Sequence, residues 1–311
     1  MKKVQKKTLL KTITKIGVTV LLVSVLVMNV DWAKSWDIAQ SADISLLILY
    51  GFLVLLGIII SAYKWKILSD FMQFDFSLGK HFRWYLAGTF VNNFLPSIVG
   101  GDTYRALSLG KIEGSRAKAI ASVLFDRYSG LIAMAMIAVF FSGLNIMQVI
   151  EHPLWLFLFF GATLGVFSQL LMLPGKKWSF FKLFFRFFPK KGERLSHALE
   201  DFRSVPLIIQ SFSWGAIFAF LGVGIANYIL FRALGTPLGL LDFLSVIFFI
   251  NIISALPVSI NNIGVKEWAY YVFFGFLGVA PEISVTAAIM SRLIQMMISF
   301  FGVGIFFKKN K

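Results

Sequence analysis

Long apolar segments, each close to the length that crosses a bilayer, are the feature that most limits how this sequence can fold. A helix needs roughly 20 mostly apolar residues to span the hydrocarbon. Because 58% of the 311 residues are hydrophobic and 14% are charged, the chain lies far from the composition of soluble domains. Seven windows approach or exceed the spanning length: 16–30 with its flanks, 44–63, 119–144, 154–173, 207–234, 240–260 and 283–307.

These windows predict an all-α fold, a polytopic integral membrane helical bundle in which residues 1–311 form a single transmembrane domain with six or more spans. Cysteine is absent, which excludes disulfides and thiolate chemistry. The histidines, His81, His152 and His197, lie in separate connecting segments, so neither a metal nor another cofactor is expected. The net charge of +15 is gathered beside apolar spans, which indicates membrane orientation rather than a nucleic acid partner.

The positive-inside rule orients the predicted spans. The lysine-rich N-terminus resembles a secretory signal without a cleavage site, so we expect a retained signal anchor that begins in the cytoplasm. The acidic loop 31–43 suits the outside, and the cations at Lys64, Lys66, Lys80 and Arg83 suit the inside. A basic loop at 174–206 and the C-terminal KKNK are also expected in the cytoplasm, which predicts a multi-pass protein of the cell (inner or plasma) membrane.

Two apolar segments do not fit simple crossings. Segment 85–101 is short and has cations on both sides, which predicts a re-entrant hairpin. Segment 240–280 has to begin and end outside, either as a second re-entrant hairpin or as two tight spans with Lys266 reaching the inside.

The two interrupted segments resemble each other. LPSIVGGDTYR (95–105) and LPVSINNIGVK (256–266) share Leu-Pro, a doublet of small or turn-forming residues, and a cation nine places after the proline. ASVLFDR (121–127) and TAAIMSR (286–292) follow them. An odd number of crossings separates the copies, which predicts two inverted repeats at about 85–144 and 246–307, an arrangement in which interrupted helices mark the binding site of many transporters.

Helix-breaking residues mark both interruptions. Proline removes a backbone donor and clashes with the preceding turn, glycine permits positive φ and close approach, and asparagine tolerates the left-handed region. Irregular backbone at membrane depth requires surrounding protein or a watery cavity. The predicted helix-break residues are Asn93, Pro96, Gly100, Gly101, Pro257, Asn261, Asn262 and Gly264.

Charged residues beside the breaks are candidate lipid-phosphate ligands. We expect Asp102 to cap a new helix and Arg105 to offer a bidentate phosphate donor, although the two also have the spacing of an interfacial ion pair. Lys266 and Glu267 allow the same two interpretations, a site charge or an interfacial turn.

Asp126 and Arg127 lie about 13 Å along an apolar helix from Lys118, where a charge costs roughly 2.5 to 3.5 kcal/mol on insertion scales. Because neighbours on a helix point about 100° apart, they cannot face the same partner. Arg127 either snorkels to the headgroups or faces a polar interior, and Arg292 is its repeat counterpart.

The motifs FLPSIVGGDTYRALSL, FDRYSGL and ALPVSINNIGVKEW resemble those of the lysylphosphatidylglycerol synthase transmembrane region, also called the flippase-like or UPF0104 membrane family. In that family the last motif usually reads like P-x-S-x-G-G-x-G-x-R-E. Here Asn261 and Asn262 replace the glycines and Lys266 replaces the arginine. The resemblance implies a protein that moves or holds lipid. The bifunctional synthases of that family carry a separate aminoacyl transferase domain, for which this chain leaves no room, so we do not expect it to transfer lysine alone.

The leading hypothesis is a non-enzymatic translocase for an anionic phospholipid or a polyprenyl-phosphate-linked lipid. One alternative is a membrane transferase with Asp102, Asp126 or Glu267 as general base. The other is an accessory subunit of a separate synthase or glycosyltransferase, docked through the basic loop, in which WSFFKLFFRFFPKK (178–191) fits a helix on anionic lipid. Homo-oligomerisation is left open.

Overall fold

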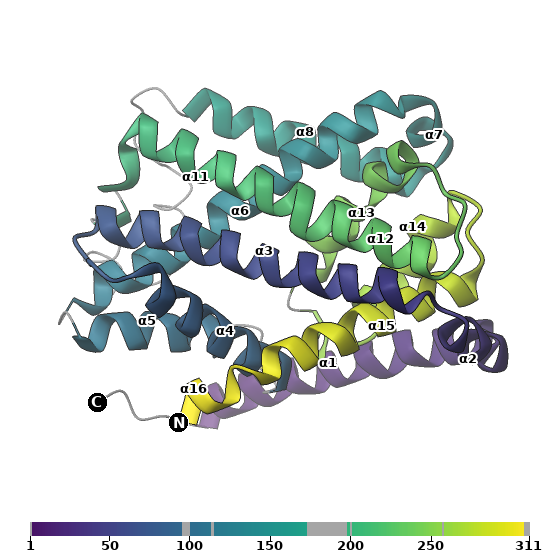
Figure 1. Cartoon of the computed structure of the whole chain (residues 1–311), viewed down its shortest axis with the longest axis horizontal. Coiled ribbons are helices and arrows are strands. Elements are labelled where there is room, and N and C mark those ends of the chain that lie inside the picture. The colour runs from purple at the N-terminus through teal and green to yellow at the C-terminus, as the bar shows by residue number, and fades with distance from the viewer. Residues whose placement is uncertain are drawn as a thin grey trace.

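A computed structural model describes residues 2–94, 100–112, 115–172, 198–199, 201–256 and 258–307. Every regular element in these ranges is a helix, and the helices form one bundle (Figure 1). Pro96, Pro257, the segment 178–191 and most of the basic loop 174–206 lie outside the described residues.

The elements follow in order along the chain: α1 Lys2–Asn29, α2 Trp32–Gln40, α3 Ile44–Phe71, α4 Leu78–Phe94, α5 Gly100–Ile112, α6 Arg116–Leu144, α7 Ile146–Glu151, α8 Pro153–Met172, η1 Asp201–Arg203, α11 Val205–Ile217, η2 Phe218–Ile225, α12 Ala226–Ala233, α13 Leu240–Ser254, η3 Ile260–Asn262, α14 Val265–Gly275, α15 Pro281–Phe300 and α16 Val303–Phe307. A π-helical turn, η2, joins α11 and α12 without a break.

Four of the described helices are long and apolar enough to cross a membrane: α3, α6, α15 and the continuous helix Val205–Ala233. The bent pair α1 and α2 adds a fifth if it counts as one span. The multi-pass helical membrane fold is therefore confirmed, with fewer full-length spans in the described chain than the six or more expected. The window 240–260 gives only the 15-residue helix α13, which stops shortly before Pro257 because proline cannot continue a helix.

Two further boundaries differ from the expectation. The window 283–307 is divided between α15 and α16 at Gly302, where an added Cβ would lie 2.7 Å from the carbonyl oxygen of Leu86 in α4. The predicted outer loop 31–43 contains the helix α2, which is bent 83° from α1.

Helices α4 and α5 form a short antiparallel hairpin. Their backbones touch at Gly88 and Gly101, where a Cβ on Gly101 would lie 2.0 Å from the carbonyl oxygen of Gly88. The amide nitrogen of Gly101 also donates to Asn92 Oδ1 at 2.8 Å. At 1.5 Å per residue, the 13 residues of α5 reach about 20 Å, which is too short for a crossing and agrees with the predicted re-entrant hairpin. Gly101 serves close approach alone, since it lacks the positive φ that we expected glycine to supply, and Gly100 is the first residue of α5.

Helices α13 and α14 form the second hairpin. With 15 and 11 residues they are also too short to span, which favours the re-entrant alternative for 240–280. Its interruption uses left-handed backbone at Asn261 (φ 51°), Asn262 (φ 56°) and Gly264 (φ 84°). The prediction that asparagine supplies this conformation is confirmed.

The two hairpins meet in the middle of the bundle. Figure 1 shows α4 and α5 toward the end where α1 begins, and α13 and α14 toward the other end. Asn261 Nδ2 donates to the carbonyl oxygen of Asn93 at 3.0 Å and so joins the two interruptions directly. This opposed placement is what inverted repeats would produce, and the repeats themselves stay a prediction.

Two clusters of buried apolar side chains surround the hairpins. One packs around Phe243, Phe248 and Phe273, and the other packs around Trp65 and Trp84. The polar residues of the interruptions lie between the hairpin tips, away from both cores. The fold therefore places irregular backbone where protein surrounds it.

Gly101→Ala should lower the thermal unfolding midpoint of the detergent-solubilised protein, followed by tryptophan fluorescence. The added methyl group overlaps the α4 backbone, and overpacking of this kind costs about 1 to 3 kcal/mol. Gly79→Ala is the matched control, because a Cβ there meets no atom within 4 Å. Equal midpoints for the two variants would contradict the close contact between α4 and α5.

Candidate functional site

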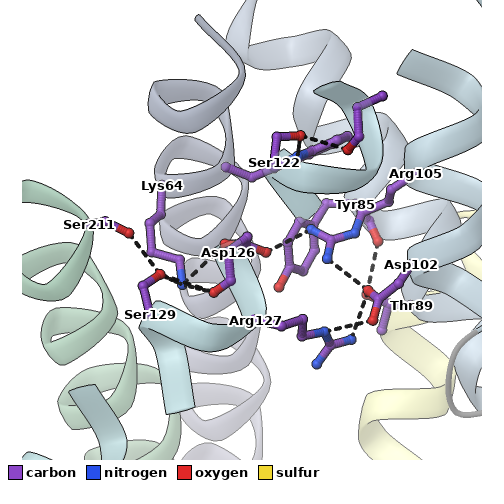
Figure 2. A network of polar contacts seen from close by, with 12 residues as sticks. Lys64, Tyr85, Thr89, Asp102, Arg105, Ser122, Asp126, Arg127, Ser129 and Ser211 are labelled. Atoms are coloured by element: carbon purple, nitrogen blue, oxygen red, sulfur yellow. Dashed lines mark hydrogen bonds and ion pairs between the residues drawn. The ribbon is translucent and has the colours of Figure 1, made fainter. Parts of the chain in front are cut away.

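Five charged side chains from three helices form a continuous ion chain, shown in Figure 2. Lys64 Nζ of α3 lies 3.1 Å from Asp126 Oδ1 of α6, and Arg105 Nη1 of α5 donates to Asp126 Oδ2 at 3.0 Å. Arg105 Nη2 donates to Asp102 Oδ1 at 2.8 Å. Arg127 of α6 donates to both oxygens of Asp102, with Nε at 2.9 Å and Nη2 at 3.1 Å. The chain carries three cations and two carboxylates, so one positive charge is in excess.

The ion chain runs from the interior to an exposed end. The side chains of Lys64, Asp126 and Arg105 are 5%, 3% and 3% exposed, whereas that of Arg127 is 49% exposed. Buried charges are tolerated when each is paired and hydrogen-bonded. Aromatic rings add to the pairing, since Arg105 Cζ lies 4.4 Å from the Tyr85 ring centroid and 4.9 Å from that of Trp65.

The ion chain corrects two expectations about Asp102 and Arg105. Asp102 does not cap α5 but lies in its first turn, where its carboxylate accepts from two arginines. The guanidinium of Arg105 pairs with Asp102 and Asp126, and it does not reach an open space. The pair at i and i+3 is formed, in the interior of the bundle rather than at its interface.

Asp126 and Arg127 point in different directions, as the helical geometry predicted. Asp126 faces α3 and α5, where it meets Lys64 and Arg105. Arg127 faces the tip of the first hairpin and binds Asp102. This placement favours the polar-interior alternative for Arg127 over snorkelling.

A second ion cluster lies at the second interruption. Arg292 Nε of α15 donates to Glu267 Oε1 at 3.0 Å, and Glu267 Oε2 accepts from the amide of Gly264 at 2.8 Å. Arg292 Nη1 donates to the carbonyl oxygen of Asn261 and Nη2 to that of Asn262, each at 3.1 Å. Arg292 and Glu267 therefore hold the left-handed turn in place.

The acid–arginine pairs at the two interruptions match. Asp102 and Arg127 are 25 residues apart, and so are Glu267 and Arg292. Each carboxylate lies in the first turn of the helix after an interruption, and each arginine lies on the long helix that follows. The sequence comparison paired Arg127 with Arg292, but it placed Arg105 opposite Lys266 and missed the match between Asp102 and Glu267, which the common spacing of 25 residues would have indicated.

A polar cavity of about 330 Å³ lies where the hairpin tips meet. Residues from both hairpins and from α6 and α15 line it: Asn92, Asn93, Arg127, Asn251, Ser254, Ala255, Asn261, Asn262, Lys266, Arg292 and Gln295. Three of these residues are cations, and none of the described lining residues is acidic. The cavity is therefore a cationic, amide-rich chamber suited to an anion.

The structure brings some predicted site residues to the cavity and sets others behind it. Arg127, Lys266, Arg292, Asn93, Asn261 and Asn262 line the cavity. Asp102, Asp126 and Glu267 lie outside its wall and pair with cations, and Arg105, also outside the wall, pairs with Asp102 and Asp126. Gly101 and Gly264 shape the hairpins, and Gly100 is the first residue of α5.

Sequence analysis missed five polar residues, Lys64 in the ion chain and Asn92, Asn251, Ser254 and Gln295 in the cavity wall. Lys64 was expected to mark the cytoplasmic end of a span, but α3 continues to Phe71 and buries Lys64 against Asp126. Lys66 lies two residues further on, so no local pattern distinguished Lys64. Asn251 and Gln295 sit in apolar helices with no distinguishing motif. Among the described residues, no group of three acidic or histidine side chains is arranged to hold a metal.

Comparisons with known proteins agree on one family. The model of the lysylphosphatidylglycerol synthase TM region matches residues 12–302. A UPF0104 membrane protein of Methanothermobacter thermautotrophicus is 26% identical, over 93% of this chain and 92% of the relative. A UPF0104 membrane protein of Pyrococcus horikoshii is 22% identical, over 95% of this chain and 96% of the relative. No solved structure matches the chain significantly.

Lys64→Met should destabilise the protein strongly, because it leaves Asp126 buried with one cation fewer. Breaking a buried ion pair on one side costs about 3 to 5 kcal/mol. Thermal unfolding in detergent measures the loss, and the double variant Lys64→Met/Asp126→Asn should recover part of it.

Lys66→Met is the control for this experiment, since Lys66 forms only a surface pair with Asp70, worth about 0.5 kcal/mol or less. If Lys64→Met were as stable as Lys66→Met, the ion chain would not contribute to the fold.

Proposed function

The chain belongs to the family of the lysylphosphatidylglycerol synthase TM region, and from this premise we propose that it is a lipid translocase. Its cavity would bind the phosphate of an anionic phospholipid or of a polyprenyl-phosphate-linked lipid. The observation that carries the proposal is the convergence of cations from both interrupted hairpin regions on one cavity. Discontinuous helices that meet in this way form the substrate sites of many transporters.

Two cations offer free donors to a phosphate. Arg127 uses Nε and Nη2 on Asp102, and its Nη1 has no partner among the described residues. Lys266 Nζ donates to Ser291 Oγ at 2.7 Å, and its ammonium has further donors to give. Arg292, by contrast, has all three of its nitrogens engaged. We therefore assign phosphate binding to Arg127 and Lys266, and support of the turn to Arg292.

The surface beside Arg127 suits the acyl chains of a lipid. Three apolar residues share the face of α6 that carries Arg127, because their spacing from it is helical. Ile120 lies seven residues before Arg127, Leu124 three residues before it, and Leu131 four residues after it. All three are exposed apolar side chains. A lipid could place its headgroup at Arg127 while its chains stay in the hydrocarbon along this face.

Movement of the lipid would follow from the opposed hairpins. If each hairpin closes the cavity from one end of the bundle, shifting them in turn would expose the headgroup to either leaflet. The bond between Asn261 and Asn93 joins the tips and would break during this exchange. We expect the end of the bundle with Lys80, Lys111 and Arg116 to face the cytoplasm, together with both termini.

A transferase receives less support from the site. A general base needs a carboxylate within reach of the proton that it removes. Asp102, Asp126 and Glu267 each accept hydrogen bonds from an arginine, and all three lie outside the cavity wall.

Proteoliposomes should move a labelled anionic lipid between leaflets faster than protein-free liposomes do. Arg127→Gln and Lys266→Gln should each reduce the rate at least about tenfold, because a lost charged hydrogen bond is worth roughly 1.5 to 3 kcal/mol. The measurement is reduction of a fluorescent headgroup by dithionite added outside.

Arg232→Gln is the matched control, since it removes an exposed cation at the end of α12 and should leave the rate unchanged. A folded wild-type protein that moved no lipid in a broad panel would contradict translocation. Equal rates in all three variants would contradict the assigned phosphate site.

A further inference from the structure

We infer that the cavity selects a phosphate-linked headgroup rich in hydroxyl groups, such as a polyol or a sugar, and rejects a headgroup that carries an ammonium group. This inference rests on the proposed function and names its substrate class. It depends on which hydrogen-bonding groups of the cavity wall are already used by the protein.

Five of the six carboxamides in the described wall donate at least one N–H group to the protein, and the sixth, Asn92, instead accepts through Oδ1 from the amide of Gly101. Asn93 Nδ2 donates to Ser299 Oγ at 3.0 Å, Asn251 Nδ2 to the carbonyl oxygen of Ile247 at 2.9 Å, and Gln295 Nε2 to Tyr50 Oη at 3.1 Å.

The two asparagines of the left-handed turn behave alike. Asn261 Nδ2 donates to the carbonyl oxygen of Asn93, and Asn262 Nδ2 donates to that of Ser254. Across the described chain, the amide oxygens of Asn93, Asn251, Asn261 and Gln295 accept no hydrogen bond. Within the described residues, the wall therefore presents free amide oxygens as acceptors, together with the N–H groups of Asn92 as donors.

Free acceptors call for donors on the ligand, and two chemical groups of lipid headgroups supply them: hydroxyls and ammonium groups. The neighbouring charges decide between these groups. Arg127, Lys266 and Arg292 line the same cavity, with no carboxylate in the described wall. An ammonium group would meet like charges there and find no counter-charge, whereas a neutral hydroxyl would donate to the amide oxygens without this repulsion.

The volume of the cavity fits one headgroup. At about 330 Å³ it lies at the lower end of small-molecule sites, which run from roughly 300 to 1,000 Å³. It has no room for acyl chains as well, and these would remain on the exposed apolar face of α6 beside Arg127. The ligand would therefore be a lipid rather than a free polyol phosphate, because the free compound gains nothing from that face.

Two lipids of equal net charge separate the alternatives. Phosphatidylinositol carries hydroxyls, and phosphatidylserine carries an ammonium group beside its carboxylate. We expect proteoliposomes to move fluorescent phosphatidylinositol and phosphatidylglycerol at least about tenfold faster than phosphatidylserine and lysylphosphatidylglycerol. Equal rates for phosphatidylinositol and phosphatidylserine would overturn the substrate class and leave translocation of anionic lipids standing.

Binding tests the substrate class even if no lipid moves. In detergent, short-chain phosphatidylinositol should raise the unfolding midpoint of the protein more than short-chain phosphatidylserine or free inositol phosphate does. Equal shifts with the serine lipid would overturn the selection, and an equal shift with free inositol phosphate would overturn a lipid as the source. Absence of transport together with selective binding would reject the translocase and keep the headgroup class.

Asn251 provides the variants that connect the selection to the wall. Its amide donates only within its own helix, to the carbonyl oxygen of Ile247, so its replacement removes no hydrogen bond between helices among the described residues. Asn251→Leu should lower the preference for phosphatidylinositol over phosphatidylserine. Asn251→Asp adds a carboxylate to the wall and should raise the relative rate for lysylphosphatidylglycerol. If neither variant changes the ratio between lipids, the amide oxygens do not select the headgroup.

Discussion

The pairing of one carboxylate with one arginine at each interruption is the constraint on which the bundle depends. A helix that stops inside a membrane leaves backbone groups without partners, and these have to be satisfied by protein. Arg292 meets this need directly through the carbonyl oxygens of Asn261 and Asn262, while Glu267 holds both Arg292 and the amide of Gly264. The ion pair and the irregular backbone thus stabilise each other, so the loss of either would destabilise the other.

The same pairing divides the charged residues into two roles. Acidic groups lie behind the wall and fix the direction of the arginines, and the described wall consists of three cations, six carboxamides, Ser254 and Ala255. The longer ion chain at the first hairpin extends this support to α3 through Lys64. The charge that faces the cavity is therefore of one sign, although carboxylates pair with the arginines behind its wall.

Periodicity and composition predicted the helical membrane fold, the interruptions in both segments and the use of asparagine in the second turn. The proline and glycine signals act within a few residues, so they can be found in one sequence. The pairing of Lys64 with Asp126 could not be found in this way, because α3 and α6 come together through packing that leaves no local pattern. Lys64 misled for this reason: beside an apolar run, a lysine at a lipid interface and one in a buried pair look alike.

The hydrogen bond between Asn261 and Asn93 has a consequence for the lifetime of the observed arrangement. It is a neutral bond, worth about 0.5 to 1.5 kcal/mol net, which corresponds to a population ratio of roughly tenfold or less. A bond of this strength favours the joined hairpin tips over the separated ones only modestly, so the separated state would remain thermally accessible. A ligand in the chamber would shift this balance only by the difference between its affinities for the joined and the separated tips, and a difference of about tenfold would be enough to offset the bond.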